Sequence, residues 1–125
     1  MDITPPIAAD RQFIQGYGGG GFRISGVRHE GSVLVLPEQT LAWPIAAANE
    51  ITRESLKPFR QAAGEVAILL LGCGSGAAII DPELRQQIRD WGAVIEAMGT
   101  GAACRTYNVL LTEERAVAAA LIAVE

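Results

Sequence analysis

The chain has 125 residues, of which half are hydrophobic and 19% are charged, a composition typical of one globular domain. Its net charge is −4, so no basic stripe is available for phosphates, and we expect no nucleic-acid partner. The longest apolar runs are too short to cross a bilayer, so we expect a soluble protein with no transmembrane segment. We therefore predict a single domain over residues 1–125, in which the proline-rich residues 1–10 form an extended arm.

The N-terminal residues carry neither a basic region with an apolar stretch nor an arginine-rich presequence. This favours a cytoplasmic location of the bacterial type. Two cysteines are too few for a disulfide framework, and with His29 as the one histidine a zinc site would lack ligands. We expect no metal and no cofactor.

The first third of the chain predicts short antiparallel strands at residues 13–17, 22–27, 33–36 and 41–43, with turns between them. The predicted turn after residue 28 includes His29. The run of four glycines from Gly18 is interpreted as a hairpin turn or bulge. A phosphate-binding loop is disfavoured, because no Lys, Ser or Thr follows at the required spacing.

The middle of the chain predicts a helix that reaches about residue 63 and is capped by Ser55 or Thr52, with Pro58 favouring Ser55 as the cap. A buried strand is expected over 66–71. A second helix is expected over 82–91, since Asp81 can cap it and proline follows at the first helical position. A strand over 93–98 would complete a right-handed β-α-β unit with two adjacent parallel strands.

The last quarter predicts a helix after the Gly99-Thr100-Gly101 turn, reaching about residue 111. Thr112 is expected to cap a final helix, in which Val117 and Leu121 share an apolar stripe. The elements together indicate an α/β fold with N-terminal β-hairpins and a C-terminal helix pair.

Two segments carry a resemblance to a known family. One is the apolar strand that ends in Gly72-Cys73-Gly74, and the other runs over residues 99–111 and contains Arg105-Thr106-Tyr107-Asn108. With the Gly-Tyr-Gly-Gly-Gly-Gly-Phe-Arg-Ile stretch from Gly16, the pattern resembles the family of mitochondrial complex I (NADH:ubiquinone oxidoreductase) assembly factor 3 and its uncharacterised bacterial and archaeal homologues.

The resemblance implies a three-layer α/β fold with a mixed central sheet. It also implies a non-enzymatic protein-binding factor that assists assembly of a membrane-associated complex. Its partners would then be proteins, including subunits of a membrane respiratory complex, and peripheral membrane association stays open. The chain departs from the family pattern at Cys73, where Thr is common, and at Gly99, where Asp is common. An activity resting on that hydroxyl or that carboxylate is not expected.

The glycine-rich turn at residues 72–76 is also typical of the cofactor site of class I methyltransferases. The turn follows a strand, and Glu96 lies 24 residues beyond Gly72, where a ribose-binding carboxylate could stand. Only 49 residues follow Gly76, too few for the rest of that sheet, and Glu96 falls inside a predicted strand. This function is therefore disfavoured.

The second function left open is a small-ligand or anion-binding domain, or a minor enzyme, that uses the two glycine turns. Arg105 lies near a helix start, where free N–H groups and the helix dipole attract anions. The structural alternative is that Arg105 satisfies loop carbonyls and Asn108 bridges the terminal helices. Cys73 and Cys104 could form a redox pair, although two buried apolar thiols are favoured. The candidate ligand- or partner-binding residues are Gly72, Cys73, Gly74, Gly99, Thr100, Gly101, Arg105 and Asn108.

Overall fold

The computed structural model describes residues 11–76 and 78–125, so the predicted arm at residues 1–10 lies outside the described residues. Three antiparallel strands form a small N-terminal sheet: β1 (Ile14–Gly18), β2 (Gly21–Ile24) and β3 (Val27–Glu30). The β1–β2 turn requires glycine, because its residues have φ of 120°, 62° and 81° at Gly18, Gly19 and Gly20. The β-hairpin prediction is confirmed here.

The predicted strand over residues 22–27 was too long. Ser25 and Gly26 have φ of 47° and 85°, so the chain reverses there and continues as β3. His29 therefore lies on β3, opposite Phe22, and not in a turn. A short strand followed by a two-residue turn keeps the alternation of a longer strand, which is why the sequence pattern concealed the reversal.

A five-stranded mixed sheet forms the centre of the fold. Its strands, in spatial order, are β5 (Thr40–Ala42), β4 (Val33–Val35), β8 (Val117–Leu121), β6 (Ile68–Gly72) and β7 (Val94–Met98). β6 is parallel to both β7 and β8, whereas β4 is antiparallel to both β5 and β8. The expected mixed central sheet is confirmed.

Helix α1 (Pro82–Trp91) connects β6 to its parallel neighbour β7, which confirms the predicted pairing. The Asp81 side chain accepts a hydrogen bond from the Glu83 N–H at 2.9 Å and caps the helix, as expected. Gly92 ends the helix at a φ of 110°, a conformation that glycine adopts without strain.

The helix predicted over residues 55–63 is replaced by a shorter 3₁₀ helix, η2 (Glu54–Phe59), which follows the single turn η1 (Ala48–Glu50). Ser55 does not cap a helix start. It exchanges hydrogen bonds with Thr52 inside a local turn, and Pro58 lies within η2. Proline removes an N–H donor from the helical ladder, so the segment is limited to short i→i+3 turns.

The prediction of a C-terminal helix pair is wrong for the second helix, which Thr112 was expected to cap. Helix α2 (Thr100–Thr112) agrees with the prediction, but the chain leaves the helical conformation after it, since Glu114 has a left-handed φ of 61°. The chain then enters β8, the central strand of the mixed sheet. Alanine favours helix intrinsically, but a site buried between two neighbouring strands overrides that preference.

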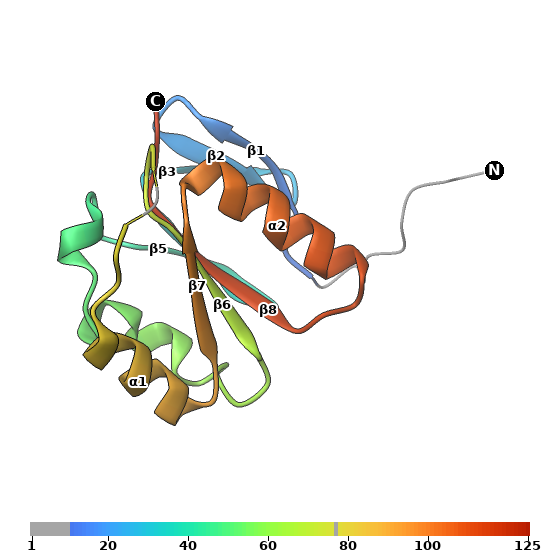
Figure 1. Ribbon diagram of the computed structural model, residues 1–125. Helices are drawn as coiled ribbons and strands as arrows, with labels where there is room; N and C mark the ends of the chain where they lie inside the picture. The colour runs from blue at the N-terminus through green and yellow to red at the C-terminus, as the bar shows by residue number, and fades with distance from the viewer. Residues whose placement is uncertain (1–10, 77) are drawn as a thin grey trace.

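The mixed sheet lies between two layers, as Figure 1 shows: α1 and η2 cover one face, and α2 with the three-stranded sheet covers the other. Alternate residues of each strand enter opposite cores. Leu69, Leu71, Ala118 and Ala120 face the first layer, and Leu70, Val117, Ala119 and Leu121 face the second. This arrangement confirms the three-layer α/β class.

No helix within the described ranges is long and apolar enough to cross a membrane.

The small side chains of β8 set how closely its covering layers approach. We predict that Ala120→Leu, at a fully buried position facing η2 and α1, lowers the free energy of unfolding by about 1–3 kcal/mol through overpacking. The matched control is Ala116→Leu, at an exposed position just before the strand, which should change it by less than about 0.5 kcal/mol. Urea unfolding measures both, and equal effects would contradict the two-sided burial of β8.

Candidate partner- or ligand-binding site

Thr100 joins three segments where β6, β7 and β8 end. Its hydroxyl group donates to the Ile122 carbonyl oxygen at 2.7 Å. Thr100 Oγ1 in turn accepts a hydrogen bond from the Gly74 N–H at 3.0 Å. The Thr100 N–H donates to the Gly74 carbonyl oxygen at 2.8 Å. Thr100 is fully buried. The first residue of α2 therefore ties the turn after β6 to the segment that follows β8.

Gly72 allows this close packing. A Cβ atom on Gly72 would lie 2.9 Å from Leu121 Cδ2 and 3.1 Å from Thr100 Cα, closer than real side chains approach. A Cβ atom on Gly99 would lie 3.4 Å from the Gly74 carbonyl oxygen. The space beside Gly72 is occupied by the protein itself, so Gly72 lets α2 approach the sheet, whereas a side-chain Cβ at Gly99 would make an ordinary contact.

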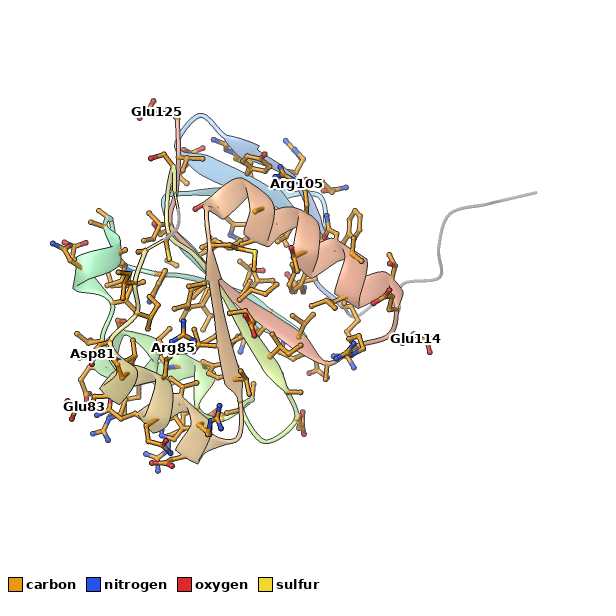
Figure 2. The ribbon with its side chains drawn as sticks, viewed as in Figure 1. Asp81, Glu83, Arg85, Arg105, Glu114 and Glu125 are labelled. Atoms are coloured by element: carbon orange, nitrogen blue, oxygen red, sulfur yellow. The ribbon has the colours of Figure 1, made fainter. Side chains whose placement is uncertain are left out.

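Arg105 is exposed, and its Nη1 donates to the Tyr17 hydroxyl oxygen at 3.1 Å. The pair lies over Gly101, where a Cβ atom would be 2.7 Å from Tyr17 Oη and 3.3 Å from Arg105 Nη1. Figure 2 shows Arg105 on the side of α2 next to the N-terminal strands. Arg105 is thus exposed, and within residues 11–76 and 78–125 it is not bonded to loop carbonyls.

Asn108 and Tyr107 fasten the N-terminal strands to α2. Asn108 Nδ2 donates to the Ile14 carbonyl oxygen at 2.6 Å, and its Oδ1 accepts from the Ile14 N–H at 3.1 Å. The buried Tyr107 hydroxyl donates to the Gln12 carbonyl oxygen at 2.6 Å, and burial raises the pKa of that phenol well above its usual range. Asn108 bridges α2 to β1, and not to a second helix.

The two cysteines are free thiols that pack against opposite cores, Cys73 against the α1 layer and Cys104 inside the α2 layer. Burial raises the pKa of both thiols, that of Cys104 to about 12. Both thiols are therefore protonated and weakly nucleophilic near neutral pH. Their placement favours two apolar side chains over a redox pair.

The predicted site residues thus divide into two groups. Gly72, Gly74, Gly99 and Thr100 meet in a closed packing contact, while Gly101 and Arg105 lie together at the surface with Tyr17. Cys73 and Asn108 join neither group. Sequence reasoning missed Tyr17 and Ile122. Tyr17 has a weak signal, as an aromatic residue just before the glycine turn, whereas Ile122 contributes only its backbone N–H and carbonyl oxygen and has none.

Removing the Thr100 hydroxyl tests the closed contact. We predict that Thr100→Val lowers the free energy of unfolding by about 1–3 kcal/mol, because the Gly74 N–H and the Ile122 carbonyl both lose their partner. Thr112→Val is the control, since its hydroxyl donates to the Val109 carbonyl oxygen at the exposed end of α2, and it should cost under about 0.5 kcal/mol. Equal unfolding midpoints for the two variants would refute the role of Thr100.

Sequence comparison places the chain among known relatives. It is 35% identical to complex I assembly factor 3 of Xenopus tropicalis over 92% of the chain and 63% of that protein, and 31% identical to the human one over 92% and 62%. The chain therefore spans a little over three-fifths of the length of these assembly factors. An uncharacterised protein of Rhodobacter capsulatus is 38% identical over 87% of the chain and 82% of that protein.

Solved structures share the fold. A Bartonella henselae protein described as an outer membrane protein has a TM-score of 0.86 at 36% identity, with 94% of this chain and 98% of that one covered. A Mth938-like domain from Bordetella pertussis has a TM-score of 0.79 at 28% identity, with 98% and 92% covered. The model of a family of unknown function, DUF498/DUF598, matches residues 14–122. The chain is thus a member of the DUF498/DUF598 family and a homologue of complex I assembly factor 3.

Proposed function

We propose that this protein is a non-enzymatic, protein-binding factor that assists assembly of a membrane respiratory complex. The observation that carries the proposal is the 35% identity to complex I assembly factor 3 over 92% of the chain. We further propose that residues 1–125 act as a single domain in a bacterial-type cytoplasm, associating with the membrane peripherally through its partners. The proposal includes no catalytic step, cofactor or metal.

The geometry supports a binding scaffold because the space beside Gly72, at the end of β6, is filled by the protein itself. The polar atoms of Thr100 and Gly74 are bonded to each other and to Ile122, and Leu121 and Thr100 fill the space beside Gly72. A cofactor cradle needs free N–H groups and open space at these positions. The remaining polar feature of the predicted site is the exposed Arg105 with Tyr17.

Arg105 supports a second candidate function, the binding of a small anion. Its guanidinium is exposed near the start of α2, where the helix dipole attracts negative charge, and Gly101 adds no side chain. The fork of donors suits a carboxylate or a sulfate. In an assembly factor, the same group would contact an acidic side chain of a partner.

Affinity purification of the tagged protein from its own cells, with quantitative mass spectrometry, tests the proposal. We expect enrichment of respiratory-complex subunits over an unrelated tagged protein, and less assembled complex on native gels after gene deletion. Unchanged complex levels together with no subunit enrichment would contradict the assembly function.

The Arg105→Ala variant belongs in the same experiment. We expect it to recover less of the partner while the free energy of unfolding changes by under about 0.5 kcal/mol, because Arg105 is exposed. Normal recovery by the variant would remove Arg105 from the partner contact. Sulfate binding that depends on Arg105, without any subunit enrichment, would favour the small-anion function.

A further inference from the structure

A charged groove runs between η2 and α1, on the face of the sheet opposite Arg105. One part is a hollow of about 160 Å³, here called the basic pocket, which is lined by Arg53, Glu54, Lys57, Arg60 and Trp91. A neighbouring hollow of about 210 Å³ also includes Arg53 and has Asp81 and Glu83 in its wall. In Figure 2 these two acidic residues lie at the start of α1. The groove is thus basic at one end and acidic at the other.

The 3₁₀ geometry of η2 builds the basic pocket. With three residues per turn, side chains at i and i+3 lie above one another. Leu56 and Phe59 are fully buried in the core, while Glu54 and Lys57 are on the exposed side with Arg60, the residue that directly follows η2. The short helix therefore separates an apolar stripe from a charged one.

Trp91, the last residue of α1, forms the opposite wall. The Arg60 guanidinium carbon lies 5.7 Å from the centroid of the Trp91 ring, within the range of a cation–π interaction. Gly92 lets the end of α1 pack closely on the segment after η2, because a Cβ atom there would lie 3.2 Å from the Ala63 carbonyl oxygen. The aromatic face and the Arg60 cation are thus held together by the packing of α1 on the segment after η2.

The basic pocket has an excess of positive charge in an acidic protein. Three of the ten basic residues line it, against one acid. Arg53 pairs loosely with Glu54, at 3.7 Å between Nη2 and Oε1. Within residues 11–76 and 78–125, neither Lys57 nor Arg60 forms an ion pair. Two cations beside a flat aromatic ring are therefore available to an anionic group.

We propose that the basic pocket binds the carboxylate of an acidic segment of a partner protein, an assignment that rests on the proposed protein-binding function. The hollow is large enough for a carboxylate side chain. Glu54 in its wall disfavours a phosphate dianion more than a singly charged carboxylate. The acidic wall at Asp81 and Glu83 then fits a basic residue further along the same segment.

The test is a titration of the ¹⁵N-labelled full chain with hexaglutamate, followed by NMR at the Trp91 indole N–H and the Arg60 Nε–H. We expect saturable shifts of both signals, and weaker binding as salt rises, because exposed charges are screened within about 10 Å at 0.1 M. Hexalysine should give no shift at Trp91.

Arg60→Glu and Lys57→Glu should each weaken hexaglutamate binding about fivefold or more, since each reverses one charge in the pocket. Arg115→Glu is the control, because it makes the same charge change at an exposed residue between α2 and β8, and it should retain wild-type affinity. An unchanged ¹⁵N spectrum away from the pocket shows that each variant is folded.

Absence of shifts at Trp91, equal weakening by Arg115→Glu, or inorganic phosphate binding as tightly as hexaglutamate would each overturn the proposal. The last result would make the pocket a small-anion site. The titration uses no respiratory subunit, so failure here leaves the purification test of the assembly function standing. Failure of the purification test in turn leaves the result of the hexaglutamate titration unaffected.

Discussion

One buried hydroxyl, that of Thr100, holds the ends of the parallel strands together through its hydrogen bonds. Thr100 Oγ1 bonds to both Gly74 and Ile122, so it links the turn after β6, the start of α2 and the exit of β8. Gly72 makes this contact possible, since any side chain there would meet Leu121 and the Thr100 backbone. At this edge of an α/β sheet, where ligands ordinarily bind, the position beside Gly72 is therefore filled by the chain's own atoms.

Two groups of exposed cations lie on the outer layers. Arg105 and Tyr17 are on the side of α2 and the small sheet, and the basic pocket is on the side of η2 and α1. Both surfaces present cations on an acidic protein, which suits partners that carry acidic side chains. In the proposed function, these two surfaces would contact such a partner.

The sequence predicted the parts of the fold whose signals are local. Helix α1 begins after Asp81 and ends before Gly92, as expected. The apolar run at residues 66–71 contributes most of the buried strand β6. β8 could not be predicted from local signals, because its alanines favour helix and only the contacts with β4 and β6 make it a strand. Thr100 was among the predicted site residues, but its bonds to Gly74 and Ile122 depend on long-range packing that no spacing in the chain reveals.

Native-state hydrogen exchange of the Gly74 amide tests the closure of the strand ends most directly. Its N–H donates to the buried Thr100 hydroxyl oxygen, although Gly74 lies in a turn. We predict protection similar to that of the neighbouring β6 amides, because the Gly74 amide can exchange only when the contact between α2 and the sheet opens. Exchange at the rate of an unstructured peptide would show that the turn is open, and would contradict the closed contact between α2 and the end of β6.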